Sequence, residues 1–593
     1  MRLREVLYKA GFAAGALSIL VFSLGHAGLL SAAYLGIALL ASSAFFIILL
    51  MNGSVSHGRG DRKSPAHIPL SVSEKLLFIS IISVISAAIP LALLPPSVRD
   101  ELIQHLAVPK LYLERGGVFQ IPFMGFSYLP QNIDLLYAIP LAFGNDIAPR
   151  LMHLLFAVMT GLVIYCYLTP RAGRVYGLLA MLLYVSTPLI FNLSRMAYID
   201  HGNAFYSTLA LVGVLEWNES SANRWLVYSA VSMGFALGSK YNSSISFLLI
   251  GAFVFYAASK RGGRIVDGLK AGLVFSLIAL ALFAPWLIRN YIWKGSPFYP
   301  IYESAAKASS MGEGVNVTGG MSPLAKRYIV YGESTSQILL LPFRLFLEGR
   351  DNTVDKFDGV LNPVLLFYLP LAFIRRGNDD KKYLLIFLCL FFLMAALTVD
   401  LATRYLMPAI PALIILVTLG VKNLFEGKYH LKILNVAALS ILFVFNAAYI
   451  AGLYGKVKPF PYIEGRETRD AYLSRALADY DAVRFADSTL PATAKVMLVF
   501  SGDRGYYWRR EYCYGDRGGT YLLGFVNNSS NDTELKEKFS GMGVTHLFAN
   551  DRLLERFIND NFHDGKVALV ANFFRNHVTR LYTSNGFSVY AIR

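Results

Sequence analysis

The residues best suited to chemistry follow directly after an apolar run. Asp100 and Glu101 lie in the polar stretch 97–106. The apolar run that precedes it, from about Lys75 to Pro96, has a length that fits a bilayer span of roughly 20 residues. A carboxylate just outside the bilayer can act as a general base, because it accepts a proton from a hydroxyl that attacks an electrophilic carbon. We therefore expect chemistry at this membrane boundary, with Asp100 as the first choice for the base and Glu101 as its neighbour.

A third acidic group, Asp200, lies in the short polar stretch 194–203 and is followed by His201. Together with Asp100 these residues could bind a divalent cation such as Mg²⁺ or Mn²⁺, although two carboxylates and one histidine form no diagnostic ligand spacing. Asp200 could equally cap the helix that follows it. The use of a metal therefore stays open.

Three isolated cations, Lys240, Arg289 and Arg404, lie at the ends of other apolar runs. Guanidinium groups match phosphate oxygens through bidentate hydrogen bonds, and a lipid headgroup is an equally expected partner for each cation alone. If the three meet the carboxylates, a substrate that bears a phosphate is favoured. The possible further substrate contacts, which are also suited to anchoring the chain at the membrane interface, are His105, Lys110 and Tyr405.

These residues are spaced along a chain that must be a membrane protein. It has 593 residues, of which 55% are hydrophobic and only 16% charged, and its mean hydropathy is +0.47. One soluble core could not bury so much apolar surface. The net charge of +16 does not indicate nucleic acid, because the Lys and Arg residues are scattered between apolar runs.

The apolar runs predict an α-helical polytopic membrane protein with about 13 spans. An opening hairpin between Ala10 and Met51 supplies two of them. The others are expected near 76–96, 148–168, 175–193, 203–217, 223–239, 242–258, 267–289, 358–374, 382–399, 403–421 and 431–453.

Basic clusters indicate the orientation. They fall in alternate loops together with the N-terminus, so those loops are expected in the cytoplasm. The stretches with the candidate site residues then face outward, as does a tail after about residue 455. The clusters are Arg59, Arg62 and Lys63; Arg171 and Arg174; Lys260, Arg261 and Arg264; Arg375, Arg376, Lys381 and Lys382; and Lys422 and Lys428.

Three domains are expected: an N-terminal hairpin with a basic cytoplasmic loop (1–74), a transmembrane catalytic domain (75–455) and a small outer α/β domain (456–593). In the tail, the apolar runs 495–500 and 544–549 are typical of strands. Helical patterns over 471–487 and 533–539 lie before and between them.

The order of several motifs resembles that of the GT-C membrane glycosyltransferases, of the protein mannosyltransferase and aminoarabinose lipid A transferase type. The similarity runs from about Lys75 to Tyr454 and is greatest to bacterial members grouped with the rhizobial lipopolysaccharide core glycosyltransferases. The motifs are Asp100-Glu101 with 105–110, Ala197-Tyr198-Ile199-Asp200, Gly238-Ser239-Lys240-Tyr241, 285–290, 295–300 and 404–411.

This resemblance implies a hexosyl- or pentosyltransferase that moves a sugar from a polyprenyl phosphate, with inversion, to a glycan, lipid or protein acceptor. The site and tail would lie on the periplasmic face of a bacterial inner membrane, with the N-terminus in the cytoplasm. Asp100 would be the catalytic carboxylate, and Lys240 and Arg404 would hold the donor phosphate. Single-step inversion needs one base and an anion-stabilising site, and the residues supply both.

Other protein classes share some of these features. A transporter or flippase of lipid-linked sugars also has many spans, but it tends to place ionisable residues near the bilayer midplane. A polysaccharide polymerase or O-antigen ligase relies on outer-loop arginines, whereas here an acidic pair leads. A non-catalytic scaffold would not need so many spans.

Overall fold

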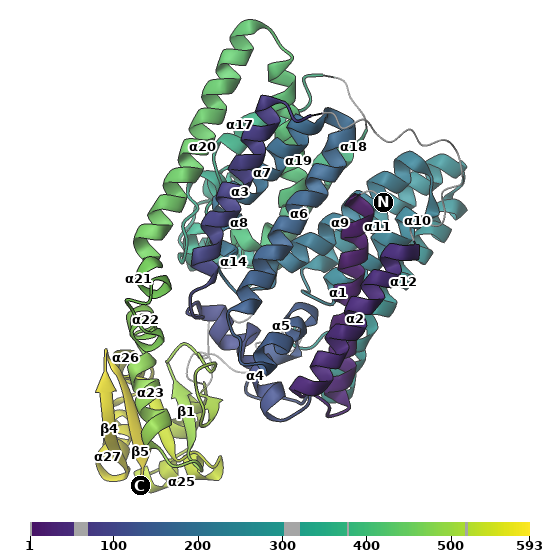
Figure 1. Cartoon of the computed structure of the whole chain (residues 1–593). Coiled ribbons are helices and arrows are strands. Elements are labelled where there is room, and N and C mark those ends of the chain that lie inside the picture. The colour runs from purple at the N-terminus through teal and green to yellow at the C-terminus, as the bar shows by residue number, and fades with distance from the viewer. Residues whose placement is uncertain (1–2, 53–68, 302–320, 376–378, 516–519) are drawn as a thin grey trace.

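The computed structural model describes residues 3–52, 69–301, 321–375, 379–515 and 520–593. Figure 1 shows a bundle of long helices, with the strands gathered in one small domain at one end of it. The predicted basic loop with Arg59, Arg62 and Lys63 lies outside the described residues, as do Arg376 and the beginning of the long outer segment after 301.

Each predicted span coincides with a long or apolar helix. Eight helices in the described part of the chain are long and apolar enough to cross a membrane, so the expected multi-pass architecture is confirmed, while the count of 13 crossings stays a prediction. The helices of the bundle are α1 (Leu3–His26), α2 (Ala32–Asn52), α3 (Val72–Ala92), α6 (Ala148–Ala172), α7 (Arg174–Ser186), α9 (Asp200–Ser220), α10 (Asn223–Leu237), α11 (Ser243–Gly262), α12 (Ile265–Lys294), α17 (Val364–Leu371), α18 (Asp380–Thr398), α19 (Ile410–Phe425) and α20 (Tyr429–Val457).

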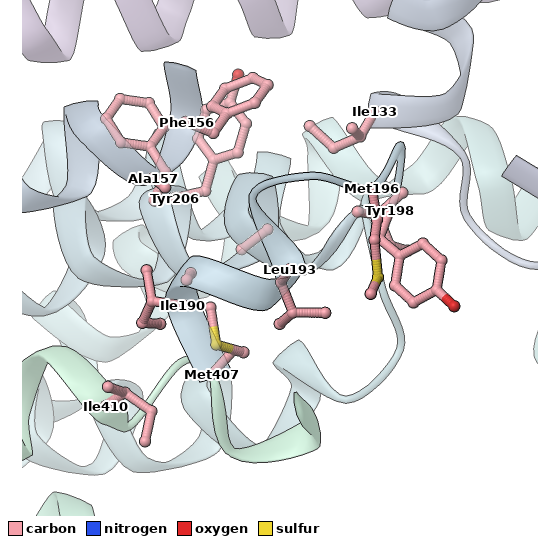
Figure 2. Packing of buried hydrophobic residues seen from close by; sticks show 14 of the residues in the cluster. Ile133, Phe156, Ala157, Ile190, Leu193, Met196, Tyr198, Tyr206, Met407 and Ile410 are labelled. Atoms are coloured by element: carbon pink, nitrogen blue, oxygen red, sulfur yellow. The ribbon is translucent and has the colours of Figure 1, made fainter. Parts of the chain in front are cut away.

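Helix α9 lies at the centre of the bundle. It packs against α6, α10 and α11, and every residue from Asp200 to Trp217 is buried. At the end of the bundle where α9 begins, apolar side chains from five segments meet, as Figure 2 shows for Ile133, Phe156, Leu193, Tyr198 and Met407. Because this cluster is closely packed, it gives the polar loops that lie against it a rigid support.

Short helices connect the spans. The segment between α3 and α6 forms a π-helix η1 (Glu101–His105), α4 (Ala107–Glu114), a 3₁₀ turn η2 (Gly125–Tyr128) and α5 (Asn132–Ala142). The other short elements in the bundle are α8 (Pro188–Leu193), α14 (Pro323–Ile329), α15 (Thr335–Leu339), α16 (Leu341–Leu347), η3 (Val354–Lys356) and η4 (Thr403–Leu406).

The basic loops that were expected on one side do gather at one end of the bundle. Arg4 and Arg171 both bind Glu216, and Arg375 and Lys422 both bind Glu426. Loops that are far apart in the sequence therefore share acidic partners, as the alternation of charge requires.

The tail forms a five-stranded mixed sheet of order β2-β1-β3-β5-β4. The predicted strands are β1 (Lys495–Val499) and β3 (His546–Asn550), which pair in parallel, and β2 (Glu511–Tyr514) pairs in parallel with β1. The antiparallel strands β4 (Val578–Ser584) and β5 (Phe587–Ile592) complete the sheet. The tail helices are α21 (Phe460–Ile463), α22 (Arg469–Ala476), α23 (Tyr480–Thr489), α24 (Thr520–Asn527), α25 (Asp532–Gly541), α26 (Asp551–Asn561) and α27 (Asp564–His577).

The tail domain holds the polar segment after α3. The Tyr507 hydroxyl donates to the Pro96 carbonyl at 2.6 Å, the Tyr506 amide donates to the Leu102 carbonyl at 3.0 Å, and the Tyr514 hydroxyl donates to the Ile103 carbonyl at 3.3 Å. Figure 1 accordingly places α4 and α5 at the same end of the bundle as the strands. The domain therefore supports the stretch that carries Asp100.

Candidate active site

A cavity of about 730 Å³ opens at this end of the bundle. Loops and helix ends from widely separated parts of the sequence line it. They bring together most of the residues that the sequence singled out, namely Asp100, His105, Asp200, Lys240, Arg404 and Tyr405.

The π-helix decides which residues of the first loop face the cavity. Its wider turn is closed by the Leu106 amide, which donates to the Glu101 carbonyl at 2.9 Å, and it brings Asp100, Gln104 and His105 to the cavity wall. Pro109 has no N–H to donate to the residue four positions earlier, so a regular α-helix cannot continue through this point. Single π-helical turns are frequent at functional sites.

Asp100 forms an ion pair with Arg404, with 2.6 Å between Oδ2 and Nη1. Arg404 comes from η4, and the rings of Tyr198 and Tyr405 lie 5.3 Å from its guanidinium carbon. Burial by itself raises the pKa of Asp100, but the charge of Arg404 outweighs this and holds the pKa below its ordinary value. The base candidate is therefore ionised at neutral pH.

A second pair of the same kind lies beside the first. The Lys240 ammonium donates to Oδ1 of Asp200 at 2.7 Å and lies 4.7 Å from the ring centre of Tyr405. Asp200 is the first residue of α9, and no side-chain cap is formed at that helix end. Asp200 thus binds a cation rather than capping its helix.

His105 pairs with a residue that the sequence did not single out. Its Nδ1 lies 2.8 Å from Oδ1 of Asp134, and both side chains are buried in the cavity wall. Asp134 lies in the first turn of α5, just after the polar turn 128–132. The sequence offered one signal for Asp134, because it is an acidic residue in the first helical turn that follows a polar loop.

The rim of the cavity adds Lys326, which binds Asp400 at 2.5 Å, and Arg99. The described wall then contains four carboxylates and four Lys or Arg side chains. They are Asp100, Asp134, Asp200 and Asp400, and Arg99, Lys240, Lys326 and Arg404. Apart from His105, the ionised side chains of the wall therefore cancel in charge.

The structure does not bring Glu101 to the cavity. Its carboxylate is fully buried and accepts hydrogen bonds from Arg150 at 2.7 and 2.8 Å and from the backbone amides of Ser97, Val98 and Ala197. Glu101 therefore joins the first loop, α6 and the second loop, and its expected place next to the reacting atoms is not supported.

Arg289 and Lys110 also lie away from the cavity wall. Arg289 donates to the backbone carbonyls of Tyr128 and Leu129, so it orders the turn before α5 instead of facing the cavity. Lys110 donates to the carbonyls of Tyr506 and Trp508 at 2.8 and 2.6 Å. It fastens the tail domain, and its burial lowers its pKa.

His201 points into the helical core and does not meet Asp100. Its ring lies 4.3 Å from that of His153, and its Nε2 lies 3.1 Å from the Ser194 hydroxyl. Within the described ranges no group of three or more His, Cys, Asp or Glu side chains is arranged to hold a metal ion. The residues proposed for a divalent cation do not fit one, because the two carboxylates are each engaged by a cation and His201 is turned away.

Part of the chain matches a known family. Residues 134–289 match the family described as dolichyl-phosphate-mannose-protein mannosyltransferase. This segment includes Asp134, Asp200 and Lys240 but neither Asp100 nor Arg404. No curated protein matches the sequence.

The whole chain is similar in fold to solved structures. ArnT from Cupriavidus metallidurans in the apo state is 13% identical over 88% of this chain and 98% of its own, with a TM-score of 0.54. The same protein bound to undecaprenyl phosphate is 13% identical over 87% and 97%, with a TM-score of 0.52. The chain is thus similar to ArnT in fold, and the predicted resemblance to the GT-C membrane glycosyltransferases is confirmed at the level of the fold.

Proposed function

We propose that this protein is an inverting glycosyltransferase that moves a sugar from a polyprenyl phosphate to a hydroxyl group of an extracytoplasmic acceptor. The observation that carries the proposal is the convergence of the Asp100–Arg404 and Asp200–Lys240 pairs on one cavity. One carboxylate supplies the base, and the two cations supply the site for the departing phosphate. The ArnT bound to undecaprenyl phosphate supports a carrier of this class.

Arg404 is prepared for an additional anion. Its Nη1 is bound to Asp100, but its Nε is buried and has no hydrogen-bond partner among the described residues. A buried donor without a partner is unfavourable, and a phosphate oxygen would satisfy it. The Lys240 ammonium has three N–H donors, of which Asp200 takes one.

Donor binding would also activate the base. A phosphate that shares the charge of Arg404 weakens the effect that lowers the pKa of Asp100. Asp100 then accepts a proton more readily when the donor is in place. The acceptor oxygen bonds to the anomeric carbon as the bond from that carbon to the phosphate oxygen breaks, and the phosphate keeps the electron pair.

The charges at the opposite end of the bundle support the proposed orientation of the site. The basic loops gather there and share Glu216 and Glu426 as partners, and such loops remain in the cytoplasm. We therefore place the cavity and the tail domain on the periplasmic side of a bacterial inner membrane and the N-terminus in the cytoplasm. The acceptor is a glycan, a lipid or a protein in that compartment.

Mass spectrometry tests the activity. Cells without the protein should accumulate one carrier-linked sugar and lack one sugar on a surface glycan, lipid or protein. The wild-type chain should restore the product, and Asp100→Asn should not, at equal expression. If Asp100→Asn restores the product fully, Asp100 is not the base.

Binding of undecaprenyl phosphate to the purified protein tests the cation site. Arg404→Ala should weaken binding by about 10-fold to 100-fold, because a hydrogen bond to a charged group contributes roughly 1.5–3 kcal/mol. Lys428→Ala, which removes an exposed cation before α20, is the matched control and should bind as the wild type does. Equal affinity in the Arg404 and Lys428 variants would exclude the phosphate role of Arg404.

A further inference from the structure

The His105–Asp134 pair has the geometry of a proton-accepting couple. An ionised carboxylate only accepts hydrogen bonds, so Nδ1 of His105, at 2.8 Å from Asp134, carries the hydrogen. The lone pair is then on Nε2, which lies 3.3 Å from the amide nitrogen of Gln104. Asp134 fixes the tautomer of the imidazole and can stabilise its protonated form.

The π-helix brings this couple close to the base. Asp100 and His105 are five residues apart, which would place them on different faces of a regular α-helix. In the wider π turn both line the cavity. The other titratable or charged groups that face the His105 ring from neighbouring elements are Asp134, Tyr198, His153 and, beyond Tyr198, Arg404.

The reaction needs a place for one proton. The hydroxyl of the acceptor loses a proton, while the leaving phosphate gains one negative charge. Asp100 accepts this proton more readily when the donor is bound, but Arg404 still lies 2.6 Å from its carboxylate and favours the ionised form, so Asp100 does not keep the proton. The ionised side chains of the described wall otherwise cancel in charge, so a protonated imidazole beside Asp134 is the group that can balance the new charge.

We propose that His105, positioned by Asp134, is a catalytic residue that receives the acceptor hydroxyl's proton by way of Asp100. This inference rests on the proposed glycosyl transfer. In the step, the proton passes from the hydroxyl to the Asp100 carboxylate and on to Nε2 of His105, leaving an imidazolium paired with Asp134. The phosphate keeps the electron pair of the broken bond, and the imidazolium loses its proton when the carrier phosphate leaves.

The product complex gives a direct test. Undecaprenyl phosphate, bound to the full-length protein in weakly buffered solution near pH 7.5, should cause uptake of about one proton per molecule bound, followed with an indicator dye. His105→Gln should bind the lipid but take up no proton. His546→Gln removes a histidine of β3 in the tail domain and should leave the uptake unchanged. Equal uptake by the His105 variant and the wild type would overturn the inference.

Transfer in isolated membranes gives the second test. His105→Gln should slow consumption of the accumulated carrier-linked sugar by about 100-fold or more and remove the loss of rate at acid pH. Asp134→Asn should reduce the rate and move this acid limb to lower pH, because the imidazolium loses its carboxylate partner. If the pair has only a structural role, the two substitutions should lower stability but leave the acid side of the pH–rate profile unchanged.

The two proposals fail differently. If the wild type neither transfers sugar nor binds undecaprenyl phosphate, the proposed function fails, and the proton role fails with it. If Asp100→Asn is inactive while His105→Gln keeps the wild-type rate and pH profile, only the role of His105 is excluded.

Discussion

The adjacent residues Asp100 and Glu101 should respond in opposite ways to the same chemical change. Glu101→Gln should strongly destabilise the fold, whereas Asp100→Asn should cost much less stability and stop sugar transfer. Both substitutions replace one carboxylate oxygen by an NH2 group, so each variant is the matched control of the other. The difference comes entirely from where the two side chains point.

The structure sets the magnitudes. The Glu101 side chain is 0% exposed and accepts five hydrogen bonds, two of them from Arg150, which is 1% exposed. Glutamine leaves the Arg150 charge buried without an anionic partner, and breaking a buried pair in this way costs about 3–5 kcal/mol. The Asp100 side chain is 18% exposed, lines the cavity and has one ion pair. Asparagine keeps an oxygen that can accept a hydrogen bond from Arg404, so this substitution should cost less than the Glu101 substitution, about 1–2 kcal/mol.

Thermal unfolding of the purified variants in detergent, followed by the loss of the monodisperse peak in gel filtration, measures this difference. Exchanging both partners, Glu101→Met with Arg150→Met, should recover much of the lost stability, because no buried charge is then left alone. If Glu101→Gln unfolds at the wild-type temperature and yet fails to transfer sugar, Glu101 belongs to the chemistry and our interpretation is wrong.

Three further predictions concern the surroundings of the site. Because the pKa of Asp100 is lowered, its pair with Arg404 stabilises the fold at all pH values above about 4 and is lost only below that; the stability difference from Asp100→Asn should be constant from pH 5 to 8. Lys110→Met removes two hydrogen bonds to the tail domain, and limited proteolysis should release that domain faster than from the wild type. Gly238→Ala places a Cβ 2.2 Å from the Asn132 amide nitrogen. Because the backbone must then shift two residues before Lys240, binding of undecaprenyl phosphate should weaken although no charge is changed.

The positions of four site residues could be predicted from the sequence. Asp100, Asp200, Lys240 and Arg404 lie at the ends of apolar runs, where a bare charge next to the bilayer is unfavourable. A charge that is retained there needs water or a partner of opposite sign, and the charge pattern places all four on the same side. Their pairing in the structure follows from these two constraints.

The direction of Glu101 could not be predicted, because it depends on one turn of the backbone. In the π-helix Glu101 turns toward α6, and its partner Arg150 lies within a predicted span, where no charged partner was expected. The predicted role of Arg289 as a phosphate ligand is not supported for a related reason. It lies at the end of a span, as a phosphate ligand would, but its partners are backbone carbonyls that leave no mark in the sequence.

The tail domain was predicted only in part. The strands β1 and β3 lie in the middle of the sheet and are almost entirely buried, so they appear in the sequence as apolar runs. The strand β4 lies at the sheet edge and is half exposed. Its mixed composition therefore gave no continuous apolar run, although it completes the sheet.

Under the proposed function, the two ion pairs would keep the site stable when empty and also help it to release its product. Unpaired Arg404 and Lys240 would be unfavourable beside the bilayer, and Asp100 and Asp200 neutralise them until a donor arrives. The phosphate must then share these cations with the carboxylates, so its binding is weaker than two free cations would give. The same competition helps the carrier phosphate to leave, because the carboxylates recover their partners. A donor without an anionic leaving group has nothing to exchange, and we expect such donors to be rejected.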